Sequence, residues 1–277
     1  MPDATKKDIV VAGKFTHPER KLRIAVTREV SAALPSCELS YLRRSPIDLA
    51  LARKQHRAYE EALAALDCRL IRLPELPEQA DAVFVEDTAV VLDELAVITR
   101  PGAESRRVET SSTAALLAGF RRLVTIMAPG TLDGGDVLQV GRTLYVGRSG
   151  RSNGQGIVQL TDAVTPHGYT VVALDLKDCL HLKTAVTLVA PGLLLMNPAW
   201  VERDAFPDMD CLEVDPVEPH GANAVLVGHN VVHPRSCPRT RERLLGRGLQ
   251  VVSVDMSETE KAEGGVTCCS LIFQGPA

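Results

Sequence analysis

The chain has 277 residues, of which 45% are hydrophobic, and a formal net charge of −4. This length supplies enough apolar side chains for one full core. The weak negative charge gives no electrostatic footprint for nucleic acid, and no apolar run approaches membrane-spanning length. We therefore expect neither a nucleic-acid partner nor a membrane-bound protein.

The first predicted strand is residues 22–28, which follow a polar segment that we interpret as an N-terminal arm, residues 1–21. Residues 22–277 are predicted to form one catalytic domain. Residues 31–46 contain two prolines and no clean periodicity, and we interpret them as a candidate lid, since long loops in compact domains are usually functional or disordered. A helix is predicted over residues 47–66, with Asp48 near its N-terminus.

After a short strand at residues 68–74, a unit of hairpin, helix and strand recurs. The last predicted strand, residues 264–273, has the first strand as its natural hairpin partner. The other predicted hairpins are residues 82–91 with 95–100, 132–140 with 143–147, 181–189 with 193–197, and 223–228 with 231–233. Helices are predicted near residues 111–120, 154–165, 198–206 and 239–246, and the strands after them at 122–127, 169–174, 211–214 and 249–254.

Each of the five hairpins begins near a polar residue of functional type. These residues follow one another at intervals of 47, 48, 42 and 45. Such periods indicate repeated units that bury their faces against their neighbours. Pairing of the last strand with the first would close the ring, as in a propeller, and would bring equivalent strand starts to one central mouth. The five residues are Glu86, Asp133, His181, Asn223 and Cys268.

The candidate nucleophile is Cys268. If residues 264–273 form a strand, Cys269 faces the core, whereas Cys268 faces a more polar space. The two glycines before the cysteine pair would let the backbone turn sharply. A plain buried cysteine is the alternative, because cysteine is among the most buried residue types. The recurrence of polar residues at the same position of each unit favours a chemical role.

A thiol beside a histidine can act as a nucleophile with a general acid and base at hand. We predict that Asp133 orients His181 and stabilises its charged form. The same region carries many carboxylates, which suits a cationic guanidinium substrate rather than an oxyanion. Attack of a thiolate on a guanidinium carbon gives a neutral adduct. Residues 100–107 and 147–153 are arginine-bearing loops, and one arginine from each could bind an α-carboxylate.

Five motifs follow one another along the chain: Phe84-Val-Glu-Asp-Thr-Ala-Val-Val, Ile98-Thr-Arg-Pro-Gly-Ala-Glu-Ser-Arg-Arg, Thr131-Leu-Asp-Gly-Gly-Asp-Val-Leu, Leu180-His-Leu-Lys and Thr267-Cys-Cys-Ser. Together they resemble the dimethylarginine dimethylaminohydrolase family of the guanidino-group-modifying superfamily. The resemblance implies a five-bladed α/β propeller and hydrolysis of asymmetric dimethylarginine or monomethylarginine to citrulline and dimethylamine or methylamine, without a cofactor.

By position, the resemblance implies that Cys268 is the nucleophile, His181 the acid and then the base, and Asp133 the partner of His181. The lid segment matches only with a gap, and Glu263 stands where the family usually has Asp. The implied substrate contacts are Glu86 and Asp87 for the guanidinium, Asp81 for the α-amino group, Arg106 and Arg151 for the carboxylate, with Phe84, Leu42 and the backbone near Ala262 completing the pocket.

Other readings of the sequence remain open. An arginine or agmatine deiminase would use the same chemistry. A non-catalytic module that binds arginine or zinc is a reading of another class, and Cys268 with His181 could hold an inhibitory zinc ion. Seven irregularly spaced cysteines and the lack of a signal-peptide core predict free thiols and a cytoplasmic protein. The chain could be a monomer or a homodimer.

Overall fold

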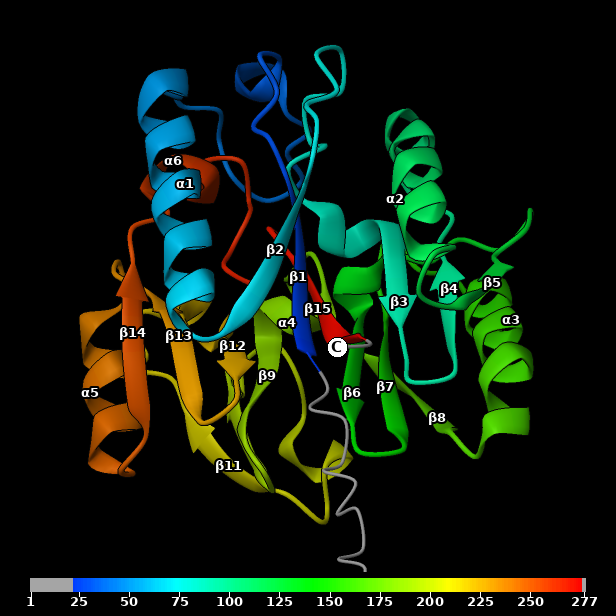
Figure 1. Ribbon diagram of the computed structural model, residues 1–277. Helices are drawn as coiled ribbons and strands as arrows, with labels where there is room; N and C mark the ends of the chain where they lie inside the picture. Colours follow the sequence, from blue (N-terminus) through cyan, green and yellow to red (C-terminus); the bar gives the residue numbers. More distant parts are fainter. Residues whose placement is uncertain (1–21, 276–277) are drawn as a thin grey trace, which may run out of the picture.

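The computed structural model describes residues 22–275 (Figure 1). The predicted arm, residues 1–21, lies outside the described residues, as do the last two residues of the chain. Across residues 22–275 no helix has both the length and the apolar character needed to cross a bilayer.

The described residues form five three-stranded sheets with one shared plan. In each sheet the middle strand pairs antiparallel with one neighbour and parallel with the other. The strands are β15 (Leu271–Gly275), β1 (Leu22–Arg28) and β2 (Cys68–Leu73); β3 (Ala89–Val91), β4 (Leu95–Ile98) and β5 (Arg122–Thr125); β6 (Val137–Val140), β7 (Thr143–Arg148) and β8 (Thr170–Asp175); β9 (Val186–Ala190), β10 (Leu193–Met196) and β11 (Asp210–Glu213); and β12 (Val225–Val227), β13 (Asn230–Pro234) and β14 (Gln250–Val254).

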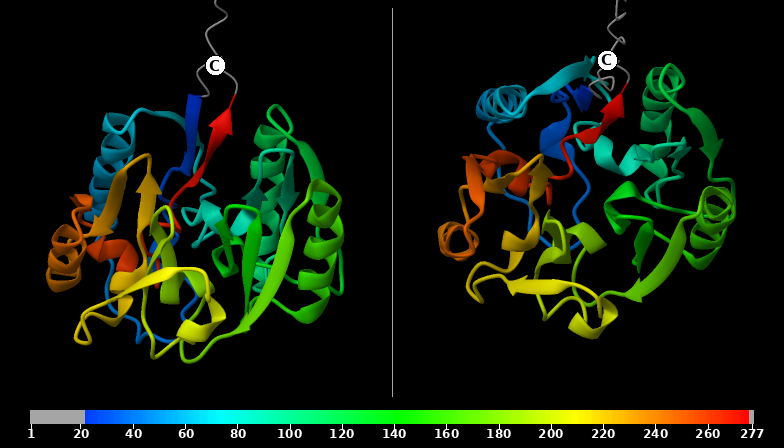
Figure 2. Two further views of the ribbon diagram at one scale, coloured as in Figure 1. Left: turned by 90° about the horizontal axis from the view of Figure 1, so that it is seen from below. Right: turned by 60° about the horizontal axis from the view of Figure 1, so that its bottom comes forward.

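The two ends of the described chain meet in one sheet, as the sequence predicts. Strand β15 pairs antiparallel with β1, from Leu22 opposite Gly275 to Val26 opposite Leu271. Figure 2 shows the five sheets arranged around a common centre, with the longer helices at the periphery. The predicted five-bladed α/β propeller, closed by its first and last strands, is confirmed.

Helices on the outside connect the parallel strands, because a parallel pair needs a long crossover. The first of them, α1 (Leu49–Ala65), begins at Asp48, whose Oδ1 accepts a hydrogen bond from the Leu51 N–H at 3.0 Å. The helix predicted at residues 198–206 is reduced to a single turn, because prolines flank this short segment on both sides. The other helices are α2 (Thr110–Leu117), α3 (Gly154–Val164), α4 (Leu182–Ala185), α5 (Pro238–Gly246) and α6 (Ser257–Glu260).

The inner strand of each hairpin begins later than the sequence predicts. The polar residues that were expected on strands lie in or next to short turns before them: Glu86 in residues 85–88, Asp133 just before 134–136, and Asn223 just after 219–222. Near the centre of the ring these segments have no neighbouring strand to pair with, so their N–H groups find other partners. The Glu86 N–H, for example, donates to the Cys268 carbonyl of another unit at 3.1 Å. The turns therefore direct their side chains toward the centre.

Candidate active site

The candidate nucleophile lies in an irregular turn, residues 264–270, rather than on the predicted strand. Two glycines are required here by close approach: a Cβ on Gly264 would lie 2.0 Å from the Phe84 ring, and a Cβ on Gly265 would lie 2.3 Å from a side-chain oxygen of Asn223. The predicted division of the cysteine pair holds, because Cys269 is fully buried and Cys268 is half-buried.

Side chains from two other blades fix this turn. Asn223 Oδ1 accepts a hydrogen bond from the Thr267 N–H at 3.0 Å, and its Nδ2 donates to Thr267 Oγ1 at 3.0 Å. The Thr267 hydroxyl in turn donates to Glu86 Oε2 at 2.7 Å. The Gly265 N–H lies 3.3 Å from the Cys268 sulfur and donates to it. The thiol is thus held by a tight backbone turn that three blades position.

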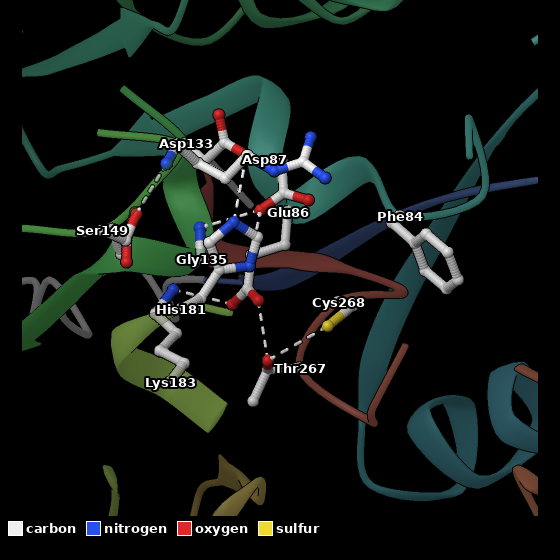
Figure 3. Close-up of polar contacts among 12 residues, drawn as sticks. Phe84, Glu86, Asp87, Asp133, Gly135, Ser149, His181, Lys183, Thr267 and Cys268 are labelled. Atoms are coloured by element: carbon white, nitrogen blue, oxygen red, sulfur yellow. Dashed lines mark hydrogen bonds and ion pairs between the residues drawn. The ribbon is translucent and has the colours of Figure 1, made fainter. Parts of the chain in front are cut away.

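The imidazole of His181 precedes α4 and is enclosed by carboxylates (Figure 3). Its Nε2 lies 3.0 Å from Asp133 Oδ2, and its Nδ1 lies 3.8 Å from Asp87 Oδ1. Asp133, which is fully buried, also accepts a hydrogen bond from the Gly102 N–H at 2.9 Å. This contact fixes the carboxylate that faces the imidazole.

A further buried acid, Asp136, holds the start of α4. Its Oδ1 accepts a hydrogen bond from the Leu182 N–H at 3.0 Å, and its Oδ2 accepts one from the Ser152 hydroxyl at 2.6 Å. Burial raises the pKa of the Asp136 carboxyl to about 6. The backbone next to the imidazole is therefore anchored to the neighbouring blade.

These surroundings raise the pKa values of both His181 and Cys268. Burial lowers the pKa of His181, but the charges of Asp87, Asp136 and Asp133 outweigh it and raise this pKa to about 9. Burial and the charges of Glu86 and Asp87 raise the pKa of the Cys268 thiol to about 12. At neutral pH the site therefore holds a neutral thiol and an imidazolium.

The two acids predicted to bind a guanidinium already have partners. The Lys183 ammonium lies 2.7 Å from Glu86 Oε1. Asp87 Oδ2 pairs with Arg106 Nη1 at 2.5 Å, while its Oδ1 accepts the Gly135 N–H at 3.0 Å. Burial raises the pKa of Asp87, but His181 and Arg106 outweigh it and lower this pKa to about 2. Asp87 is thus an anion beside the imidazole.

Most of the predicted site residues line one narrow cavity of about 30 Å³. Leu42 does not line it: this leucine is 40% exposed and borders a wider cavity of about 290 Å³ that also reaches Cys268. Asp133 does not line the narrow cavity either but contacts His181, which does, whereas Glu86 lines another cavity. The predicted residues that line the narrow cavity are Asp81, Phe84, Asp87, Arg106, Arg151, His181, Ala262 and Cys268.

The two arginines predicted to bind a carboxylate differ in their surroundings. Arg106 is buried, and it donates to Glu109, to Asp87 and to the carbonyl oxygens of residues 81 and 84. It therefore organises the acids and the backbone around them. Arg151 has looser contacts: its Nη1 lies 3.5 Å from Glu38 Oε2. The carboxylate-binding role stays a prediction for both.

Sequence reasoning missed three charged residues of the site. Lys183 could have been found, because a carboxylate in an apolar segment needs a counter-charge and Lys183 lies close to His181 in the sequence. Glu109 stands three residues after its partner Arg106, a spacing that allows ion pairs in a helical segment. Glu38, which lines the narrow cavity, carries no local signal.

A metal would find its ligands in a different set from the one predicted. Within residues 22–275, the ligand atoms of Asp87, Asp133 and His181 lie within 4.8 Å of one another, and all three residues are buried. Cys268 is not in this group. Zinc binding by Cys268 and His181 stays a prediction.

Comparison with known proteins agrees with the motifs. No family model matches the chain. It is 38% identical over 228 residues to the N(G),N(G)-dimethylarginine dimethylaminohydrolase of Pseudomonas aeruginosa, covering 82% of this chain and 90% of that protein. It is 41% identical over 250 residues to the protein of the same name in Streptomyces coelicolor, covering 89% of this chain and 95% of the other.

Solved structures show the same fold. A Cys-to-Ser variant of the P. aeruginosa enzyme complexed with citrulline matches with a TM-score of 0.88 and 35% identity, over 91% of this chain and 100% of the other. The N-terminal domain of a cyanobacterial arginine dihydrolase has a TM-score of 0.83 at 19% identity, covering 92% of this chain and 98% of that domain, which shows a shared fold alone.

The fold and the site together define a propeller-type hydrolase with a cysteine, a histidine and several acids at its centre. The chain belongs to the dimethylarginine dimethylaminohydrolase family.

Proposed function

We propose that this protein hydrolyses the guanidinium group of Nω-methylated L-arginine, giving citrulline and dimethylamine or methylamine. The observation that carries this proposal is that a half-buried thiol and an imidazolium face one narrow cavity lined by carboxylates. A planar cation is the guest that such a cavity favours, because carboxylates pair bidentately with a guanidinium.

In the proposed complex, the guanidinium lies between Cys268 and His181, next to Asp87. Among residues 22–275 the thiol makes no hydrogen bond to the imidazole. Figure 3 shows that the thiol contacts the Thr267 hydroxyl, which in turn donates to Glu86. Asp81 binds the α-amino group and Arg151 the α-carboxylate at the other end of the cavity.

The charge of the substrate prepares the nucleophile. A thiol of pKa about 12 is almost entirely neutral at pH 7, and a guanidinium beside it stabilises the thiolate. The thiol proton passes to solvent as the substrate binds. His181 is already protonated, so it can serve as the general acid in the first step.

The thiolate attacks the guanidinium carbon and forms a neutral tetrahedral adduct. The His181 imidazolium protonates the methylated nitrogen, and the C–N bond breaks to release the amine and leave a cationic thiouronium on Cys268. His181, now neutral, takes a proton from water as the water oxygen attacks the same carbon. Collapse of the second adduct breaks the C–S bond and, after loss of a proton, gives citrulline and the thiolate.

Citrulline formation tests the proposal. We expect the wild-type protein to form citrulline from asymmetric dimethylarginine or monomethylarginine, and Cys268→Ser to lose this activity. Cys237→Ser is the matched control, because this cysteine borders the wider cavity and not the narrow one. If Cys268→Ser turned over substrate as fast as wild type, Cys268 could not be the nucleophile. No citrulline from wild type with any arginine derivative would rule out the function.

A further inference from the structure

The loop that borders the narrow cavity brings an acidic residue of its own to the residues assigned to the substrate head group. The backbone N–H of Glu38 donates to Asp81 Oδ2 at 3.1 Å. The Glu38 carboxylate forms an ion pair with Arg151, in which Oε2 lies 3.5 Å from Arg151 Nη1. Its other oxygen accepts a hydrogen bond from the Ser105 hydroxyl. Glu38 thus contacts both Asp81 and Arg151.

These two contacts copy the chemistry of an α-amino acid. An N–H donor faces a carboxylate, as an α-ammonium would, and a carboxylate faces a guanidinium, as an α-carboxylate would. A head group bound to the same two residues would compete with Glu38 for the Asp81 carboxylate and for the Arg151 guanidinium. The cavity here is only about 30 Å³, which is too small for both occupants.

The loop is held in this position from a second side. The Glu263 carboxylate accepts hydrogen bonds from the backbone N–H groups of Ser40, Tyr41 and Leu42, at 3.0, 2.6 and 2.6 Å. Hydrogen bonds from N–H groups to a charged carboxylate are among the stronger ones in proteins. Glu263 therefore anchors the loop just beyond Glu38, and Glu38 is placed by contacts on both sides.

We propose that Glu38 competes inside the protein with the head group of the substrate, and that its carboxylate must leave Arg151 before an α-amino acid binds. This inference rests on the proposed function. It also names the class of ligand that the site selects. A ligand with both an α-ammonium and an α-carboxylate replaces both contacts of Glu38, whereas an agmatine-like amine, which has no carboxylate, can replace only the contact with Asp81 and leaves Glu38 on Arg151.

Citrulline and agmatine binding to the Cys268→Ser protein, measured by isothermal titration calorimetry, test this competition. We expect Glu38→Ala in that background to bind citrulline about three- to tenfold more tightly, because pairing of Arg151 with Glu38 reduces the apparent affinity by the fraction of protein in which Arg151 is free. Agmatine affinity should not rise, since the freed Arg151 repels it. Glu104→Gln is the matched control, because Glu104 is a highly exposed acid that pairs with Arg107.

With the reactive cysteine restored, Glu38→Ala should lower KM for asymmetric dimethylarginine by the same factor and leave kcat unchanged. The side chain of Glu38 is 44% exposed, so the substitution should leave the thermal unfolding midpoint close to wild type. An unchanged citrulline Kd in Glu38→Ala would overturn the competition, and a weaker Kd would make Glu38 a substrate ligand instead. If the wild-type protein is active, either of these two Kd results refutes this inference alone. If the wild-type protein is inactive, the proposed function and this inference both fail.

Discussion

The ionisation of Cys268 gives the sharpest check on the electrostatics of the site. Burial and the charges of Glu86 and Asp87 raise the pKa of this thiol from 9.0 to about 12. At pH 8 a shift of this size leaves about 1000-fold less thiolate than an unperturbed cysteine would have. Since the thiolate is the nucleophile, the protein without substrate should react very slowly with iodoacetamide at Cys268.

The alkylation rate of Cys268 should therefore keep rising with pH through pH 10. Glu86→Gln removes one of the charges that raise the thiol pKa and also frees the Lys183 ammonium, so both effects lower this pKa. We expect the variant to be alkylated about tenfold faster at pH 8. Glu202→Gln, which alters an exposed ion pair with Lys177, should behave as wild type.

Mass spectrometry of the peptide that contains both cysteines measures the rate, and tandem fragmentation separates Cys268 from the fully buried Cys269. A rate that levels off below pH 8 would refute the reasoning. That profile would mean that the free protein holds a preformed thiolate and imidazolium pair, and that the substrate charge has no part in activating the nucleophile.

Three further substitutions test other parts of the structure. Asp133→Asn removes a charge that raises the pKa of His181, the proposed general acid, so kcat should fall by about 100-fold or more and its alkaline limb should move to lower pH. Gly264→Ala places a methyl group against an aromatic ring and should lower the free energy of unfolding by about 1–3 kcal/mol in urea titrations. Burial raises the pKa of Glu60, but the nearby His56 imidazole and hydrogen bonds from Arg72 and Thr27 outweigh it and lower this pKa to about 2. Glu60→Gln should therefore be less stable than wild type at pH 7, and the difference should shrink as the pH falls from about 5 toward 2.

Each of these has a control and a contrary result. For Asp133→Asn, a lower kcat with an unmoved alkaline limb would contradict the role of its charge. Gly154→Ala is the control for Gly264→Ala, because a Cβ at Gly154 meets no atom within 4 Å, and equal stability of the two variants would refute the packing argument. For Glu60→Gln, a stability difference that does not change with pH would point to lost packing instead of lost charge.

The sequence predicted the elements that local patterns control. The middle strands β4 and β10 are apolar and wholly buried, and such runs are recognisable because both faces of the strand are covered. The cap at Asp48 is equally local. The even spacing of five polar residues was enough to predict a closed ring of similar units, since each unit must bury its apolar face against a neighbour.

The sequence could not predict how the chain behaves at the centre of the ring. Residues expected to extend the inner strands form turns, because their N–H groups bond to other blades, as Glu86 bonds to Cys268. The contacts of Glu38 with Asp81 and Arg151 likewise join residues that no local pattern connects.

The sequence by itself determined which blades form and which reactive side chains each blade carries to its inner end. Only the tertiary structure decided which of these side chains meet, how they ionise, and that the loop at residues 38–42 lies on the head-group residues. The physical reason is that patterns along the chain report local burial and capping, whereas partners far apart in the sequence are chosen only when the ring closes.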